Sequence, residues 1–392
     1  MNKKIVNFAW LLVLAGVLIL IGMFIKSYSD GFRIINADID FTTTGQFGDY
    51  IGGVVGTFFA LAGTLLIFLT FKEQVKQNKI EGFESTFFEM VNLHRENVNQ
   101  MNYTKLDSGV MATAHHRKVF RLIFREFLEC YREVKKFSNS KNIDDYILPK
   151  YKRKLQGIID NNNKKIDLLE LIIIDIAYNI VYYGIGEEGE IFLRERFKKK
   201  YNHFYFYRIL RFIKIKPKRE NDDRWRKWEG LLNLPYKKFK EVNEEFYLYR
   251  KHLNIDDLLS ETKNLIYEVE YSKYYGGHQH RLGHYFRHLF QSYKYLNYSL
   301  DIEDKERKFY GKTLRAQLST YEQALLFINS LSSLGMKWEL TPEKDLLLKN
   351  DNIEKCNLIS QYNLIKNLPG SHFLGIRYKV YYPKVKYETD EN

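Results

Sequence analysis

Two long uncharged runs near the start of the chain limit its possible folds more than any other feature. Residues 5–25 and residues 50–71 contain no Asp, Glu, Lys or Arg. About 20 consecutive apolar residues cross the hydrocarbon core of a bilayer as a helix, because a backbone in lipid must make its own hydrogen bonds. A secretory signal peptide would have a shorter apolar run followed by a cleavage site of small residues. Residues 1–80 are therefore predicted to form a transmembrane hairpin of two helices.

The charges around the two runs predict the orientation of this hairpin. The loop between the runs is acidic, with Asp30, Asp38, Asp40 and Asp49 against Lys26 and Arg33. The outer flanks are basic, with Lys3, Lys4, Lys72, Lys76 and Lys79. Since Lys and Arg are enriched on the cytoplasmic side of membrane helices, both termini are expected in the cytoplasm. The first expected partner is the phospholipid bilayer, which the chain crosses twice.

Small residues recur along the second run at helical spacing. They are Gly52, Gly56, Ala60 and Gly63. Such a stripe lets two membrane helices approach closely, and here it predicts packing against the first helix or self-association with another copy. The alternative is that glycine is simply common in membrane helices.

The rest of the chain is predicted to be a large helical domain. The chain has 392 residues with only six Pro and two Cys. Few prolines favour long helices, and Cys130 and Cys356 are too few for a disulfide framework or a cysteine-based zinc site. The formal net charge of +13 favours an anionic neighbour such as nucleic acid or a phospholipid surface.

The expected fold class is mainly α. Apolar spacing predicts helices over residues 83–101, 110–137, 164–183 and 312–333. After the membrane hairpin, an all-helical cytoplasmic domain is expected over residues 81–335, followed by a C-terminal extension over residues 336–392. Within that extension, "GIRYKVYY" alternates apolar and basic residues, which predicts one short strand or an extended tail.

A basic and aromatic segment over residues 198–219 differs from its surroundings. Its candidate binding residues are Lys198, Lys199, Lys200, Arg208, Arg211 and Lys214. Aromatic rings between cations suit RNA, where bases stack and phosphates are neutralised. They equally suit anionic lipid headgroups. The remaining alternative is a solvated basic face whose aromatic residues belong to the core.

Four segments resemble the phage abortive infection family of AbiC type. They are "FESTFFEMVNLHRENV", "AYNIVYYGIG", "GHYFRHLFQSYKYL" and "LRAQLSTYEQALLFINSLS", in this order between Glu81 and Ser333. The matching positions are Phe87, Phe88, His94, Tyr285, Phe286, Arg287, Leu289, Leu318, Ser319, Tyr321, Glu322 and Asn329. The resemblance implies a role in bacterial defence against phage, in which infected cells stop growing or die. The two predicted spans, in a bacterial protein, imply a location in the inner membrane. It implies no catalytic mechanism.

The stretch "HQHRLGHYFRHLFQSYKYL" over residues 278–296 is predicted to be a helix whose polar face holds most of its histidines. His284 and His288 have the spacing of a helical zinc site, but no carboxylate or cysteine nearby completes the ligand set. A second interpretation is a helix docked on its neighbours. In that case Arg287 is expected to pair with a buried acid such as Glu322.

A third interpretation of the same stretch is a metal-independent ribonuclease. Arg281 and His288 are separated by six residues, near the R-x4-6-H spacing of HEPN-type ribonucleases, and Arg287 is the other candidate arginine. In such a pair an arginine holds the scissile phosphate and a histidine moves a proton. The candidate catalytic residues are therefore His288, Arg287, Arg281, His94 and Glu322.

The predicted function is a membrane-anchored abortive infection protein that senses phage and acts at the membrane. A membrane-tethered ribonuclease and a non-catalytic scaffold are the alternatives, and no metal site and no cofactor is expected. The position of His94, Arg287, His288 and Glu322 bears most directly on this choice. Their convergence on one open basic cleft would favour chemistry, and their burial would favour packing.

Overall fold

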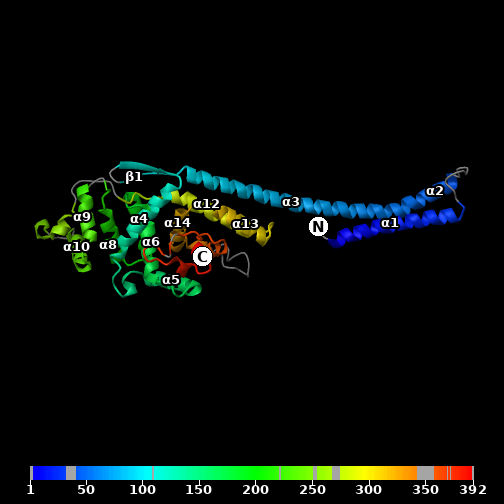
Figure 1. Ribbon diagram of the computed structural model, residues 1–392. Coiled ribbons are helices and arrows are strands. Elements are labelled where there is room, and N and C mark those ends of the chain that lie inside the picture. The colour runs from blue at the N-terminus through cyan, green and yellow to red at the C-terminus, as the bar shows by residue number, and fades with distance from the viewer. Residues whose placement is uncertain are drawn as a thin grey trace. The chain divides into compact units, whose positions relative to one another are not determined.

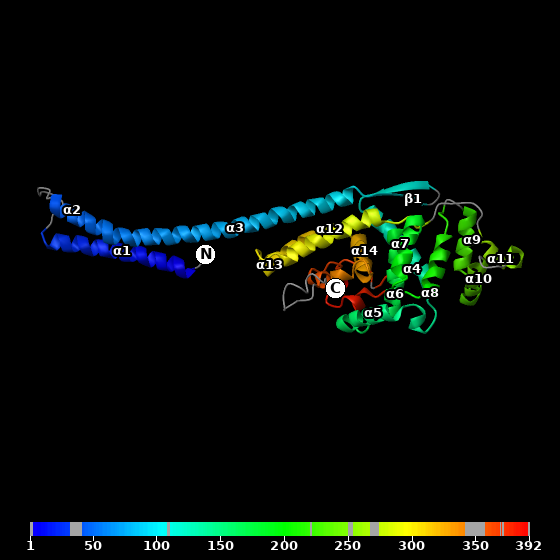
Figure 2. The same cartoon turned by 180° about the vertical axis from the view of Figure 1, so that it is seen from behind.

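The computed structural model describes residues 3–31, 41–107, 110–219, 222–249, 254–266, 274–341, 357–368, 370 and 372–390. Within them the chain is mainly helical, as predicted (Figures 1 and 2). It divides into two compact units, Met1–Thr86 with Ser299–Ile302 and Phe87–Tyr298 with Glu303–Asn392. The predicted loop charges Arg33, Asp38 and Asp40, together with Cys356, lie outside the described residues.

The first unit is built on two long helices. α1 covers Lys3–Ser29, and α3 (Gly56–Asn99) follows the short helix α2 (Phe41–Tyr50) and a π-helical turn over Ile51–Val55. By length and composition, α1 and the helical stretch Thr44–Asn99 could each cross a membrane. Both predicted apolar runs are thus helical, and both helices continue beyond the runs.

The face that α3 buries in the first unit differs from the predicted small-residue stripe. Along the π-helical turn and the first part of α3, buried side chains lie seven residues apart at Val55, Ala62 and Leu69, and Phe83 is buried further along α3. α1 lies close to α3, since a Cβ added at Gly16 would come within 3.1 Å of the Phe59 ring. By contrast, a Cβ at Gly52 or Gly63 would meet no described atom within 4 Å. Self-association through the stripe remains a prediction.

The second unit is a bundle of shorter helices around a buried central helix. Its larger helices are α4 (Lys118–Lys135), α5 (Pro149–Asn162), α6 (Leu168–Tyr183), α7 (Glu187–Phe197), α8 (His203–Lys214), α9 (Asp222–Leu232), α10 (Tyr236–Tyr249), α12 (Gln279–Tyr298), α13 (Asp304–Arg315) and α14 (Thr320–Leu331). The described residues also form the one-turn helices α11 (Ser260–Lys263), α16 (Leu358–Gln361) and α17 (Tyr378–Tyr381). Every residue of α6 from Leu171 to Val181 is buried, and α4 and α14 both pack on α6.

Local chemistry fixes both ends of α6. The Asp167 side chain accepts a hydrogen bond from the backbone N–H of Leu169, which is the usual N-cap arrangement. At the other end Gly184 has φ of 79°, a conformation that side chains rarely adopt. A Cβ there would lie 2.7 Å from the backbone of Gly276 and Gly277. Glycine therefore allows the segment that precedes α12 to lie directly against the end of α6.

The predicted helix over residues 110–137 is wrong in its first part. β1 (Asn102–Asp107) and β2 (Val110–His115) form an antiparallel hairpin in which Thr104 faces Thr113, and the helix α4 begins only at Lys118. The paired threonine hydroxyls lie 2.9 Å apart. Cross-strand pairs of β-branched residues stabilise such a ladder, whereas the apolar spacing that indicates a helix starts further along the chain.

The predicted helix over residues 312–333 is two helices. α13 ends at Arg315 and α14 begins after Ser319. Ser319 and Glu322 form a reciprocal capping box, in which each side chain satisfies the backbone N–H of the other. The capping residues thus start a new helix inside the apolar pattern.

The short C-terminal strand expected in "GIRYKVYY" is absent from the part of the chain that the structure describes. An isolated bridge joins Phe373 and Ile376, and Tyr378–Tyr381 is the one-turn helix α17. Tyr378 and Tyr382 are both buried. Their spacing of four residues places them on one face of a helical turn, so burial of the rings outweighs the alternation that predicts a strand.

Candidate functional site: the His94 pocket

A pocket of about 460 Å³ lies in the second unit where three segments meet. The end of α3 contributes His94, Arg95, Val98 and Asn99; the start of α4 and the residues before it contribute His115, His116, Arg117 and Lys118; and Gln317 comes from the α13–α14 connection. We call it the His94 pocket.

His94 is the unusual residue of this pocket. Its side chain is 1% exposed, and neither ring nitrogen has a hydrogen-bond partner among the described residues. Burial is the largest cause that lowers the pKa of His94 to about 4, and electrostatic interactions with His288 and Arg117 lower it further. The imidazole is therefore neutral near pH 7 and keeps one unused donor and one unused acceptor. A buried polar group without a partner costs about 1–3 kcal/mol.

The cations of the pocket are held in place by hydrogen bonds around Gln317. Arg95 donates from Nε to Oε1 of Gln317 at 3.0 Å, and Arg117 donates from Nη2 to the Gln317 carbonyl at 2.8 Å. His116 places Nδ1 2.8 Å from the carbonyl of Asn99. With Lys118 at the rim, this arrangement favours an anionic ligand over a cationic or apolar one.

Glu322 lies behind the pocket and is fully buried. It accepts hydrogen bonds from the hydroxyls of Tyr285 (2.9 Å) and Ser319 (2.5 Å) and from the Ser319 backbone N–H (2.8 Å). Arg117 Nε lies 3.7 Å from the same carboxylate. One carboxylate thus connects α12, α14 and the residue that precedes α4.

One lining residue of the pocket, Gln317, lies in a segment that matches a known family. Residues 277–347 match the family described as "putative phage abortive infection protein". The match confirms the resemblance to the abortive infection family. It covers α12, α13 and α14, and so includes Tyr285, His288, Gln317 and Glu322. No curated protein and no solved structure matches the chain.

The structure brings together only part of the predicted site around the matched segment, residues 277–347. His288 lies beside His94, with ring centroids 6.4 Å apart, and its Nε2 lies 2.8 Å from the Met90 carbonyl. Arg287 is exposed and donates from Nε to the carbonyl of Gly283 in its own helix at 3.0 Å. The expected ion pair between Arg287 and Glu322 is therefore wrong, because Arg117, Tyr285 and Ser319 surround that carboxylate.

Arg281 belongs to a different polar cluster. It donates from Nε to the Asn102 carbonyl at 2.8 Å, and its Nη1 lies 3.3 Å from Nδ1 of His278. His278 in turn contacts the buried carboxylate of Glu126 at 2.9 Å. Burial raises the pKa of Glu126, but His278, Lys105 and Tyr103 together lower it to about 2. This cluster fastens the β1–β2 hairpin to α4 and to the start of α12.

Most cations of the predicted binding segment over residues 198–219 have partners inside the second unit. Lys198 pairs with Glu195 (2.8 Å), Lys200 with Asp175 (3.5 Å), Arg208 with Glu244 (3.6 Å) and Lys214 with Glu190 (2.6 Å), while Arg211 donates to the Tyr247 carbonyl (2.8 Å). Lys199 is exposed. The rings of Tyr205, Phe206 and Phe212 are buried. This arrangement favours the alternative in which the aromatic residues of the segment belong to the core, over a binding surface for RNA or lipid headgroups.

Sequence reasoning missed Arg117, His115, His116 and Gln317. The run "HHRK" over residues 115–118 is a signal for these residues in the sequence, but it lies within the predicted helix over residues 110–137. Gln317 carries no such signal, because its role depends on the break between α13 and α14. Among the described residues no three His, Cys, Asp or Glu side chains are grouped to hold a metal ion.

Proposed function

We propose that the chain is a phage abortive infection protein anchored in the bacterial inner membrane, whose second unit senses infection through the His94 pocket. The family match supports the defence role, and the two long apolar helices support the anchor. The observation that carries the sensor role is His94, a buried imidazole without a hydrogen-bond partner among the described residues, in a cationic pocket.

The proposed ligand is a small anionic group such as a phosphate. An anion beside His94 accepts its N–H and raises its pKa, because a negative charge favours the imidazolium. The same anion competes with Glu322 for Arg117, whose Nε lies 3.7 Å from that carboxylate. Binding therefore acts on the contacts among α4, α12 and α14. His94 also lies in α3, the continuous helix that contains the second candidate span, which offers a route to an effect at the membrane.

Plaque counts on cells that express variants test the sensor role. His94→Phe keeps a ring on the apolar face and removes both nitrogens, and Arg117→Gln removes the charge. Both are expected to lose protection against phage while the protein accumulates normally in the membrane fraction. His203→Phe changes an exposed histidine of α8 and is expected to protect fully. Full protection by a stably made His94→Phe protein would reject the sensor role and leave the scaffold.

A second candidate function, a metal-independent ribonuclease, is favoured by the pairing of His94 with Arg117 in one cationic pocket. Arginine would hold the phosphate and histidine would move the proton. Arg281 and Arg287 suit this role less well, because both donate to backbone carbonyls outside the pocket. RNA cleavage by the purified chain in the presence of a metal chelator, lost in His94→Phe, is the result that would favour this enzyme.

A further inference from the structure

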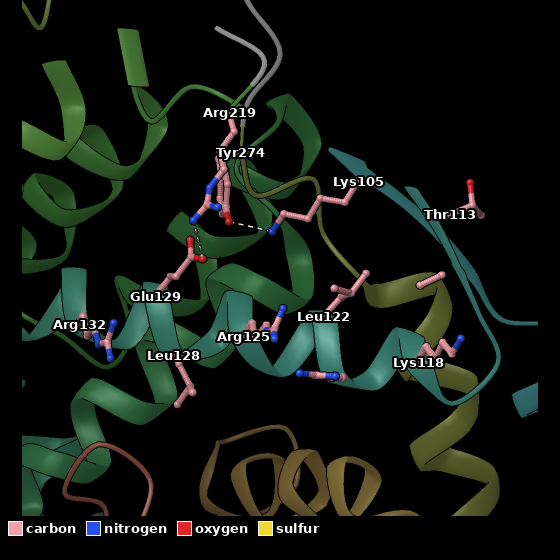
Figure 3. A pocket seen from close by; sticks show the side chains of 12 residues that line it. Lys105, Thr113, Lys118, Leu122, Arg125, Leu128, Glu129, Arg132, Arg219 and Tyr274 are labelled. Carbon is pink, nitrogen blue, oxygen red and sulfur yellow. Dashed lines mark hydrogen bonds and ion pairs between the residues drawn. The ribbon is translucent and has the colours of Figure 1, made fainter. Parts of the chain in front are cut away.

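A second and larger hollow, of about 710 Å³, runs along the outward face of α4. Figure 3 shows Lys118, Arg125 and Arg132 along the helix, with Lys105 and Thr113 from the hairpin on one side and Arg219 and Tyr274 above. Six of its lining side chains are cationic: Lys105, Lys118, Arg121, Arg125, Arg132 and Arg219. We call it the α4 groove.

The charge of the α4 groove is largely uncompensated. Its one acid, Glu129, lies 3.0 Å from the buried Lys216 and 3.9 Å from Arg219, and Lys105 is paired with Glu126 at 2.9 Å. The four lining cations that lie on α4 are Lys118, Arg121, Arg125 and Arg132, and all four are exposed. In the part of the chain that the structure describes, no acid is paired with any of these four.

The spacing of these four cations forms a row. Lys118, Arg121, Arg125 and Arg132 follow one another by three, four and seven residues, so they share one face of the helix. At 1.5 Å per residue the row extends over about 21 Å. A single phosphate group is much shorter than this row, whereas the backbone of a nucleic acid repeats its phosphates along its length. Three of the four are arginines, whose planar forks bind phosphate oxygens in pairs.

The lining argues against a lipid surface as the occupant. Segments that lie on membranes insert exposed aromatic or long aliphatic side chains between the headgroups. In the α4 groove Leu122 and Leu128 are only half-exposed, and Tyr274 is 4% exposed with its ring under Lys105. A positively charged groove that tracks the backbone is a common feature of proteins that bind single strands without sequence preference.

We propose that the α4 groove binds the phosphate backbone of single-stranded nucleic acid, without reading its sequence. Lys118 lines both the α4 groove and the His94 pocket, so a strand along α4 leads toward His94. The inference stands apart from the sensor role of His94. Loss of strand binding on neutralising α4 would support the groove even if His94→Phe protected normally.

Fluorescence anisotropy of a labelled single-stranded RNA with the full chain in zwitterionic nanodiscs tests the proposal. The test variant carries Arg121→Gln, Arg125→Gln and Arg132→Gln. The matched control carries Lys150→Gln, Arg153→Gln and Lys154→Gln, three exposed cations of α5. The slope of log affinity against log salt is expected to fall by about 2 in the test variant, at about 0.7 per lost phosphate contact, and to stay unchanged in the control.

Further arms decide among the remaining explanations. Three Arg→Lys changes at the same positions keep the charge and are expected to keep most of the salt slope, which attributes the loss to the removed charge. Single-stranded DNA is expected to bind similarly, and duplex RNA more weakly. Equal salt slopes in the test and control variants would overturn the proposal. So would a loss of binding confined to anionic vesicles, which would identify a lipid surface.

Discussion

His94 and Glu126 are buried titratable residues that the second unit accommodates in opposite ways. Glu126 keeps its charge, because His278, Lys105 and Tyr103 all contact its carboxylate. His94 has no such partner among the described residues and stays neutral instead. The contrast separates a structural cluster, in which every group is satisfied, from a pocket in which a donor and an acceptor remain available.

The neutral state of His94 predicts a particular pH dependence of stability. An unfolded histidine titrates near pH 6.5, whereas the pKa of folded His94 is lowered to about 4. Between these values the unfolded state binds more protons, so folding stability is complete above pH 6.5 and falls as the pH drops toward 4. The difference corresponds to about 3 kcal/mol. Glu126, with a pKa of about 2, loses its stabilising charge mainly below this window.

Denaturant unfolding of the wild-type chain and of His94→Phe between pH 4.5 and pH 7 measures this dependence. Phenylalanine cannot take up a proton, so the variant is expected to lose distinctly less stability on acidification. His288, Arg117 and Tyr285 face the ring from other elements and are unchanged in both proteins. The same fall in unfolding free energy for both proteins would show that His94 is already satisfied or protonated.

At the scale of elements, the break between α13 and α14 depends on a single cap. Ser319 satisfies the start of α14 and donates to the buried Glu322. Ser319→Ala is expected to lower the free energy of unfolding by about 1–2 kcal/mol, since it removes an N-cap and a donor to a buried carboxylate. Thr313→Ala removes a hydroxyl that bonds only within α13 and is expected to change stability by less than about 0.5 kcal/mol. A similar fall in the free energy of unfolding for Ser319→Ala and Thr313→Ala would mean that the Ser319 cap does not maintain the break between α13 and α14.

Helices with strong apolar periodicity were predictable from the sequence, and their interruptions were not. The apolar runs of α1 and α3 and the buried helix α6 can be predicted from their local apolar patterns alone, without knowledge of tertiary contacts. The hairpin of β1 and β2 forms between consecutive strands, and the break at Ser319 is set by its capping box with Glu322, neither of which the apolar spacing indicates. His94 and Glu322 were identified as candidates, but Arg117 replaces Arg287 between them, because only the fold determines which arginine reaches the carboxylate.

At the scale of the whole molecule, the proposed function places the helices of the first unit in the lipid bilayer and the second unit in water. The first unit offers two apolar helices with basic outer flanks, and the second offers cationic pockets that suit a ligand in water. Anionic ligands such as phosphates or nucleic acid strands occur in the cytoplasm. The orientation of the transmembrane hairpin therefore decides whether the His94 pocket and the α4 groove can reach their proposed ligands.

Reporter fusions test this orientation. A reporter placed after Lys79 is expected to report the cytoplasm, and one inserted between α1 and α2 is expected to report the opposite side, because Lys72, Lys76 and Lys79 follow the second run and acids dominate the loop. Replacing Lys72, Lys76 and Lys79 by Gln weakens the charge bias and is expected to produce a mixed orientation. Replacing Lys150, Arg153 and Lys154 instead, far from either run, should leave the orientation unchanged. An external reporter after Lys79 in the unaltered chain would contradict the two-span hairpin and remove the His94 pocket and the α4 groove from any cytoplasmic ligand.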